Sequence, residues 1–287
     1  MENLFCTHAD ILGETALFDT HTHSTVSDGG NTPEQMLDGA AFKGLKVFAL
    51  TDHFDIHDRF PEPCSRFDGA GRESSYQQLT ALKESHEAKG DTGIKFLKGI
   101  EIGQAHHYTE VAENWLNSHN YDFVLASCHI IRSIEKTDFY SMDYSKNAPD
   151  LMLKQYFTEL IELCSWGASN ENKYFDSLSH LTYPLRYMSG KGDINKHTHV
   201  IDELFAIMVE HDIALEINTG GGAVMCPEFP QIKRYYELGG RLITIGSDSH
   251  NVSSIGGGIG KGIEMAKSAG FSECVYYEKR RPRFIRF

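Results

Sequence analysis

Side chains of the kinds that bind divalent metal ions recur along the whole chain, most of them directly after an apolar run. They are Asp19-Thr20-His21-Thr22-His23, Asp28, Asp52-His53, Glu101, His129, His180 and Asp248-Ser249-His250. Residues i and i+2 of an extended segment point to the same side, so His21 and His23 can bind one ion, and Asp248 and His250 repeat that spacing. Imidazoles and carboxylates together favour Zn, Mn, Fe or Co. The pattern therefore predicts a site for several divalent metals.

Seven apolar runs that are typical of buried strands position these side chains. They are Thr15–Asp19, Val47–Thr51, Lys95–Ile102, Phe123–Ser127, Asp176–Ser179, Ala214–Asn218 and Leu242–Gly246. Helical patterns lie between them, starting at Thr32-Pro33-Glu34 and over Ala148–Cys164, His199–His211, Pro227–Leu238 and Gly262–Ala269. This alternation predicts a single parallel α/β barrel domain over residues 1–287, with the carboxyl ends of the strands on one face. Two loop-like stretches, Asp55–Arg72 and Arg132–Pro149, are expected to lie over that face.

Several of these positions also have ordinary structural interpretations. Glu101 interrupts an apolar run, where a carboxylate is unfavourable unless it meets a cation. We interpret it as a bridging metal ligand, with a buried salt bridge as the alternative. His129 and His180, each taken alone, would fit a hydrogen-bonded core histidine. Asp19 is expected to orient a ligating ring, and Asp248 to exchange a proton with a bound water.

Two arginines are candidates for binding a phosphate group. Arg132 and Arg186 follow His129 and His180 by three and six residues, which places both over the strand-end face. A guanidinium group binds phosphate oxygens in a bidentate manner, although either residue could be an ordinary surface arginine. The glycine-rich segment Gly256–Gly262 lacks the first glycine and the Ser or Thr of a phosphate-binding loop, so it is not interpreted as one.

Composition restricts the classes of function. The net charge of −13 argues against broad binding of nucleic acid or anionic membranes. The basic segment Lys279–Arg286 is accordingly interpreted as a solvated or core-docking terminus. The six cysteines are scattered without a C-x-x-C pair, which favours reduced thiols. The N-terminus has no secretory pattern and no apolar run is long enough to cross a membrane, so a cytoplasmic location is expected.

Taken together, the ligand pattern resembles that of the polymerase-and-histidinol-phosphatase (PHP) family, from about Leu17 to the C-terminus. The segments DSLSHLTYPLRY, ALEINTGG and GGRLITIGSDSH and the ending RRPRF are similar to its histidinol-phosphate phosphatase branch. The resemblance implies a distorted (β/α)7 barrel with a metal site at the C-terminal ends of the strands, which agrees with the seven predicted strands. It also implies three divalent ions (Zn, Mn or Fe), bound by His21, His23, Asp28, His53, Glu101, His129, His180, Asp248 and His250.

The activity implied is hydrolysis of L-histidinol phosphate to L-histidinol and phosphate in histidine biosynthesis, with a hydroxide that bridges two ions as the nucleophile. Asp248 or His53 is expected to supply the leaving group's proton, and Glu101 to hold two ions together. The loop Asp55–Glu62, with Asp55 and His57, is expected to contact the substrate. The partner is then a small phosphate ester, with no nucleic acid and no membrane.

Two other activities fit parts of the same pattern. A PHP-type phosphodiesterase or nuclease is disfavoured by the acidic charge and by the lack of any other domain. An amidohydrolase-like metal hydrolase also uses H-x-H in a barrel. That class typically has a carboxylated lysine in the bridging position, where this chain has Glu101.

Overall fold

A parallel sheet that is nearly closed into a barrel forms the centre of the computed structural model, which describes residues 18–56, 69–134, 139, 142–145, 148–171, 173–223 and 225–287. The strands follow one another around the sheet in the order β1 (Phe18–Asp19), β2 (Val47–Leu50), β4 (Lys95–Gly103), β5 (Phe123–Ser127), β6 (Ser177–Leu178), β7 (Ala214–Asn218) and β8 (Ile243–Gly246). The short strand β3 (His53–Asp55) pairs with the second half of β4. The prediction of a seven-stranded parallel barrel is confirmed, and β3 was not predicted.

The segments that follow β1 and β8 close the barrel. Thr22 forms a parallel bridge with Ser249. The backbone N–H of Asp248 donates to the carbonyl of His21 at 2.8 Å, and the N–H of His23 donates to the carbonyl of Ser249 at 2.8 Å. The segments His21–His23 and Asp248–His250 therefore lie side by side, because the hydrogen bonds between them close the barrel.

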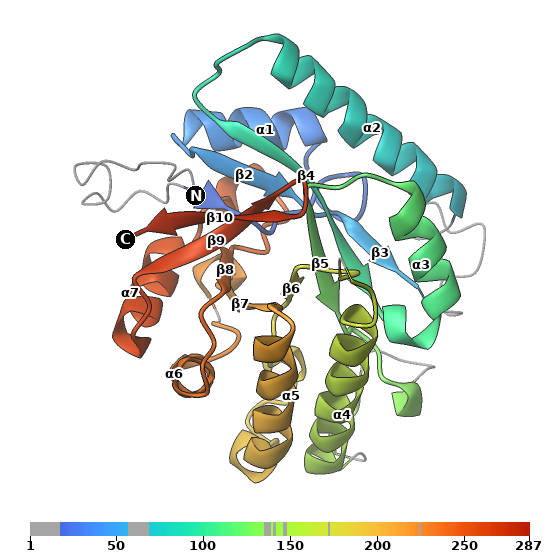
Figure 1. The fold of residues 1–287 in the computed structure, drawn as a ribbon, viewed down its shortest axis with the longest axis vertical. Coiled ribbons are helices and arrows are strands. Elements are labelled where there is room, and N and C mark those ends of the chain that lie inside the picture. The colour runs from blue at the N-terminus through green and yellow to red at the C-terminus, as the bar shows by residue number, and fades with distance from the viewer. Residues whose placement is uncertain are drawn as a thin grey trace.

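Seven helices of the described chain surround the sheet (Figure 1). They are α1 (Pro33–Phe42), α2 (Gly69–Ala88), α3 (Thr109–Ser118), α4 (Pro149–Gly167), α5 (Thr198–Glu210), α6 (Phe229–Glu237) and α7 (Ile259–Ala269). Helix α1 begins as predicted, with Thr32 and Gln35 in a capping box and Pro33 in the first turn.

Helices α2 and α3 were missed in the sequence. The range Asp55–Arg72 was predicted as a loop, but residues 69–72 belong to α2. The reason is local: two glycines near the start of α2 have low helix propensity, and its apolar positions are sparse. Within the described residues, no helix is both long and apolar enough to span a bilayer.

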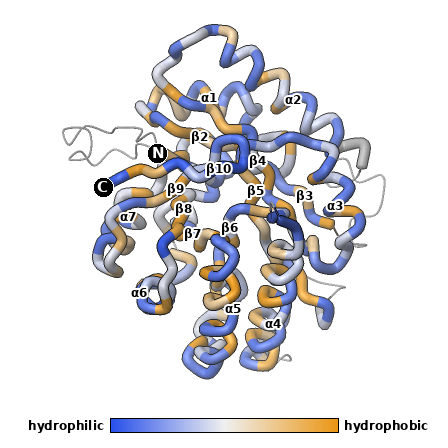
Figure 2. Tube along the Cα trace, in the orientation of Figure 1, coloured by the Kyte–Doolittle hydropathy of each residue, from blue (hydrophilic) through white to orange (hydrophobic). Residues whose placement is uncertain are grey.

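The strands are buried on both faces, as parallel strands covered by helices must be. Every residue of β2, β5, β7 and β8 is buried. Figure 2 shows hydrophobic residues along the strands, and hydrophobic and hydrophilic residues alternating along the helices. The strand backbone is thereby held rigidly, which fixes the side chains that leave its ends.

An antiparallel hairpin of β9 (Glu273–Glu278) and β10 (Arg281–Arg286) lies across the end of the barrel where the strands begin (Figure 1). The Tyr277 ring stacks on Phe123, the first residue of β5, with centroids 5.5 Å apart. Arg280 pairs with Asp176, which directly precedes β6, at 2.7 Å. The basic C-terminal segment is therefore a docked strand, and it closes the end of the barrel opposite to the predicted metal site.

Candidate metal centre

The nine predicted ligand residues converge at the carboxyl ends of the strands. They form three overlapping groups whose ligand atoms lie within 4.8 Å of one another, with Asp248 beside the first group: His21, His23 and Glu101; Glu101, His129 and His180; and His23, Asp28, His53 and His250. Strand ends thus bring together residues that are up to 229 positions apart (21 to 250) in the sequence.

The first group lies deepest in the barrel. The Nε2 atoms of His21 and His23 are 3.0 Å apart. Glu101 Oε2 lies 3.3 and 3.5 Å from these two nitrogens. Asp248 Oδ1 lies 3.7 and 3.3 Å from them. Two nitrogens and two carboxylate oxygens therefore face one point.

Glu101 connects this group with the second. Its Oε1 atom lies 2.8 Å from His180 Nε2 and 3.4 Å from His129 Nε2. The same two imidazole nitrogens are 3.2 Å apart. The Oε2 atom also lies 2.9 Å from His53 Nδ1. Each oxygen of this fully buried carboxylate thus faces a different pair of the histidines in the first two groups, which is the geometry of a bridging ligand.

The third group is nearer to solvent. Asp28 Oδ1 lies 3.3 Å from His250 Nε2 and 3.7 Å from His53 Nε2. The His23 ring stacks between the other two rings, with centroids 4.2 Å from His53 and 4.4 Å from His250. This group therefore adjoins the first through His23.

The donor set fits divalent metal ions. A metal–nitrogen bond of about 2.0–2.1 Å and a tetrahedral angle place two ligating nitrogens about 3.3 Å apart, close to the observed 3.0 and 3.2 Å. Among the described residues, His23 Nδ1 is a buried nitrogen without a hydrogen-bond partner. An unpaired polar atom is unfavourable in a protein interior unless a cation is nearby. The residues therefore fit the divalent metal ions that the sequence implied.

Metal binding requires neutral imidazoles and ionised carboxylates, and the pKa values of His23 and Glu101 are shifted in that direction. Burial lowers the pKa of the His21 and His129 rings, but neighbouring carboxylates outweigh it and raise the pKa of both. Burial, together with the neighbouring histidines, lowers the pKa of His23 to about 3. Burial opposes the charge of Glu101, but His53, His21 and His129 outweigh it and hold the pKa of the carboxyl well below its usual range. The central ligand is therefore anionic and His23 is neutral.

Glu216 is a buried carboxylate of the site that the sequence analysis did not single out. It lies in β7 and accepts from His21 Nδ1 at 2.6 Å, from the backbone N–H of His180 at 2.8 Å and from Asn218 Nδ2 at 3.2 Å. A carboxylate behind a ligating histidine fixes its tautomer and orientation. The signal was the same as for Glu101, a carboxylate within a buried apolar strand.

The role predicted for Asp19, orienting a ligating ring, is wrong. Its oxygens accept backbone N–H groups of His21 at 3.3 Å, Ser247 at 2.9 Å and Gly256 at 2.8 Å, so it joins β1 to the end of β8. Strand β1 directs this side chain toward β8 and away from the rings. Glu216 and Asp55 instead contact the Nδ1 atoms of His21 and His129.

Asp55, predicted to bind substrate, lies behind His129 in the structure. Its Oδ1 accepts from His129 Nδ1 at 2.7 Å and from Gln104 Nε2 at 2.9 Å, and the residue is 5% exposed. His57 and the rest of the loop to Glu62 lie outside the described residues. The structure therefore places Asp55 where it orients a predicted ligand.

The two predicted phosphate-binding arginines occupy different surroundings. Arg186 ends a 3-10 turn, Tyr183–Arg186, and donates to Asp248 Oδ2 at 3.0 Å and to Asn218 Oδ1 at 2.6 Å. Arg132 donates instead to Glu162 at 2.5 Å, and its side chain is 43% exposed. Of the two, it is Arg186 whose guanidinium contacts the cluster.

The barrel, the cluster of side chains at the strand ends and the bridging carboxylate are together typical of a class of metal-dependent hydrolase. The PHP domain family matches residues 19–220. The chain therefore belongs to the PHP family, as its motifs indicated.

Two relatives and one crystal structure refine this placement. The Clostridium acetobutylicum protein named "Probable histidinol-phosphatase" is 29% identical over 93% of this chain and 99% of its own length. The histidinol-phosphatase of Lactococcus lactis is 27% identical over 90% of this chain and 93% of its own length. A crystal structure of the Lactococcus lactis histidinol phosphate phosphatase, in complex with zinc, L-histidinol and phosphate, superposes with a TM-score of 0.72 and 25% identity. It covers 93% of this chain and 98% of that one.

Proposed function

We propose that this chain is a metal-dependent phosphomonoesterase that hydrolyses L-histidinol phosphate to L-histidinol and phosphate. The observation that carries the proposal is Glu101, whose two oxygens face two separate pairs of histidines at the strand ends. The full-length similarity to histidinol-phosphatases supports the choice of substrate, because the Lactococcus lactis enzyme was crystallised with L-histidinol and phosphate.

Three divalent ions are proposed for the cluster, one for each group of ligands. His21, His23, Glu101 and Asp248 would hold the first, Glu101, His129 and His180 the second, and Asp28, His53 and His250 the third. Bound there, such ions supply Lewis acidity, which stabilises negative charge on phosphate oxygens and makes water a nucleophile near neutral pH.

The chain's own residues account for positioning and proton transfer. The Arg186 guanidinium lies beside Asp248 and can bind a phosphate oxygen in the ground state and more strongly as charge builds up in the transition state. Asp248 and His53 are the groups proposed to take a proton from the attacking water and pass it to the leaving alkoxide. Asp55 and Glu216 hold His129 and His21 in orientation.

A covalent intermediate on sulfur is disfavoured. Cys128 directly precedes His129, but its side chain is 1% exposed and donates to the carbonyl of Ile130. Burial raises the pKa of this thiol well above its usual range, so the nucleophilic thiolate is not formed. Direct attack by water on phosphorus is therefore proposed.

Elemental analysis together with a phosphate-release assay tests the proposal. Zinc-loaded protein should contain more than two divalent ions per chain and release phosphate from L-histidinol phosphate, and prolonged chelation should abolish the release. A content of one ion per chain would refute the three-ion arrangement. Full activity of chelated, metal-free protein would refute the metal-dependent mechanism.

A further inference from the structure

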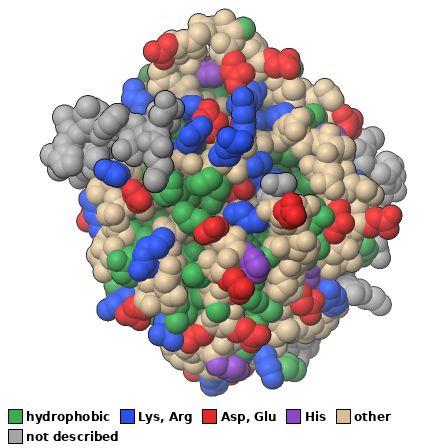
Figure 3. Space-filling view, viewed as in Figure 1, with side chains coloured by type: hydrophobic (Ala, Val, Ile, Leu, Met, Phe, Trp, Pro, Cys, Tyr) green, Lys and Arg blue, Asp and Glu red, His purple; other side chains and the backbone are tan. Residues whose placement is uncertain are grey.

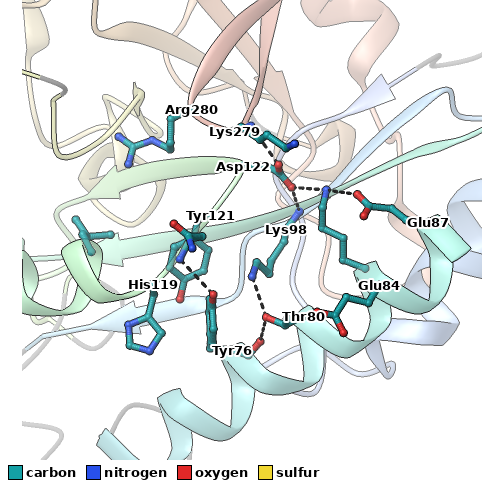
Figure 4. A pocket seen from close by; sticks show the side chains of 13 residues that line it. Tyr76, Thr80, Glu84, Glu87, Lys98, His119, Tyr121, Asp122, Lys279 and Arg280 are labelled. Atoms are coloured by element: carbon teal, nitrogen blue, oxygen red, sulfur yellow. Dashed lines mark hydrogen bonds and ion pairs between the residues drawn. The ribbon is translucent and has the colours of Figure 1, made fainter.

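A cavity lies at the end of the barrel opposite to the metal centre. Its volume is about 640 Å³, and it lies between α2, the segment that leads into β5 and the β9–β10 turn (Figure 4). Asp122, in its wall, precedes β5, whereas His129 of the metal centre follows β5. The strand between them separates the two sites by on the order of 20 Å. The volume is within the range of about 300–1,000 Å³ usual for small-molecule sites.

Lys98 supplies this cavity with a buried positive charge. The residue is 6% exposed, and its ammonium donates to Thr80 Oγ1 at 2.8 Å and lies 4.0 Å from the centroid of the Tyr76 ring. Over the described ranges of the chain, Lys98 forms no ion pair with a carboxylate. A buried ammonium without a counterion is unfavourable, so this group calls for an anion.

The acidic residues nearby pair with other cations. Lys83 lies 2.7 Å from Asp122 and 3.2 Å from Glu87, so the cation that faces both carboxylates is Lys83 and not Lys98. Glu84, which also lines the cavity, is exposed at its rim. Within the described chain, none of these carboxylates therefore forms an ion pair with Lys98 itself.

The hairpin turn adds the cation Lys279 in a conformation that favours glycine, whereas the neighbouring Arg280 pairs with Asp176. Lys279 and Arg280 line the cavity and have φ angles of 52° and 62°, the left-handed region that side chains other than glycine rarely adopt. Asp122 holds the turn by accepting the N–H of Lys279 on its carboxylate and the N–H of Arg280 on its carbonyl. Figure 3 shows Lys and Arg side chains together with Asp and Glu on this face, where the hairpin meets α2. Positive φ at both central residues is the usual geometry of a two-residue hairpin turn, and it places Lys279 at the mouth of the cavity.

We propose that this cavity binds a small organic anion, a carboxylate or phosphate group on a planar apolar body. The anionic group pairs with Lys98, and Lys279 adds a second positive charge at the mouth. Tyr76, Tyr121 and Leu116, which line the cavity, supply apolar surface for the body of the ligand. This site shares no residue with the metal centre, so the proposal is independent of the reaction assigned to that centre.

Titration with matched probes tests the site. Benzoate and phenylphosphonate carry the two candidate anionic groups on one ring, and benzamide is the uncharged counterpart of benzoate. Trp115 reports on binding, because its ring stacks on His119, a residue of the cavity wall, with centroids 3.7 Å apart. We expect its fluorescence to saturate with at least one of the two anions, and the affinity for that anion to fall about tenfold or more in Lys98→Met.

Controls separate loss of the site from loss of the fold. Lys233→Met, on the exposed face of α6, should bind like wild type. Lys98→Met should keep its melting transition and its rate of phosphate release from the metal centre. If Lys98→Met fails to fold, Lys279→Met at the exposed turn takes its place with the same expected loss. Benzamide binding as tightly as benzoate, neither anion binding, or unchanged anion affinity in the folded lysine variant would each overturn the proposal.

Discussion

Glu216 lies behind His21, a proposed metal ligand. Replacing Glu216 with Gln changes one atom and should weaken the binding of metal by His21. Glu216 accepts hydrogen bonds from three donors, with Oε1 facing His21 and Oε2 facing the N–H of His180 and Asn218. A glutamine has one acceptor oxygen and must direct its NH₂ group at one set of these donors. If the NH₂ group faces His21, the ring must accept on Nδ1 and carry its proton on Nε2, the atom that faces the metal site.

The expected loss can be worked out from this geometry. Replacing a residue that orients a metal ligand weakens metal affinity or activity about 10–100-fold, which corresponds to about 1.4–2.7 kcal/mol. Glu216 is fully buried and its contact with His21 is only 2.6 Å, so we expect a value toward the upper end. Both the apparent zinc affinity and kcat/KM should fall.

Competitive chelator titration measures the zinc affinity, and phosphate release measures kcat/KM, for wild type and Glu216→Gln in parallel. Glu203→Gln, an exposed residue of α5, makes the same chemical change without contacting the site and should have no effect. A Glu216→Gln protein that keeps wild-type zinc affinity and turnover would refute the role assigned to this carboxylate.

Three further changes probe other parts of the account. Glu101→Gln should lower turnover by orders of magnitude with loss of metal, and elemental analysis showing full metal at normal turnover would contradict its bridging position. Arg186→Ala should lower kcat/KM by about 2–4 kcal/mol, whereas Arg132→Ala should lower it far less; steady-state kinetics showing the reverse order would assign phosphate binding to Arg132. Burial raises the pKa of Glu159, but hydrogen bonds from two adjacent histidines outweigh burial and lower it from 4.5 to about 2. Its ionised form therefore stabilises the fold above pH 4.5, and this contribution is lost as the pH falls toward 2. Thermal melting of Glu159→Gln should accordingly differ most from wild type near neutral pH and least in acid, and a constant difference would contradict this reasoning.

Much of the site could be predicted because ligands at the ends of parallel strands leave two signals together, an apolar run and a polar residue of a metal-binding type. His21, His23 and His129 carry both signals, and the structure brings them together. Glu216 carries the same signal as Glu101. That signal does not tell whether a carboxylate faces the metal position or the Nδ1 atom of a ligating histidine. That difference depends on how β7 packs beside β6 and β8.

The remaining differences have physical causes outside the local sequence. Nothing in the spacing of Arg132 and Arg186 distinguishes them, because the choice depends on where Glu162 lies on α4. Asp19 lies two residues from His21, yet the strand directs it to Ser247 across the barrel closure. Helix α2 has a weak apolar pattern and becomes stable through packing against β2 and β4, which a local window does not contain.

Substrate preference tests the central claim most directly. We would compare kcat/KM of the zinc-loaded protein for L-histidinol phosphate, 4-nitrophenyl phosphate and bis(4-nitrophenyl) phosphate under one set of conditions. We expect the highest value for L-histidinol phosphate, a lower value for the aryl monoester and the lowest for the diester. A protein that prefers the diester, or that treats L-histidinol phosphate no better than the aryl monoester, would contradict the assigned function.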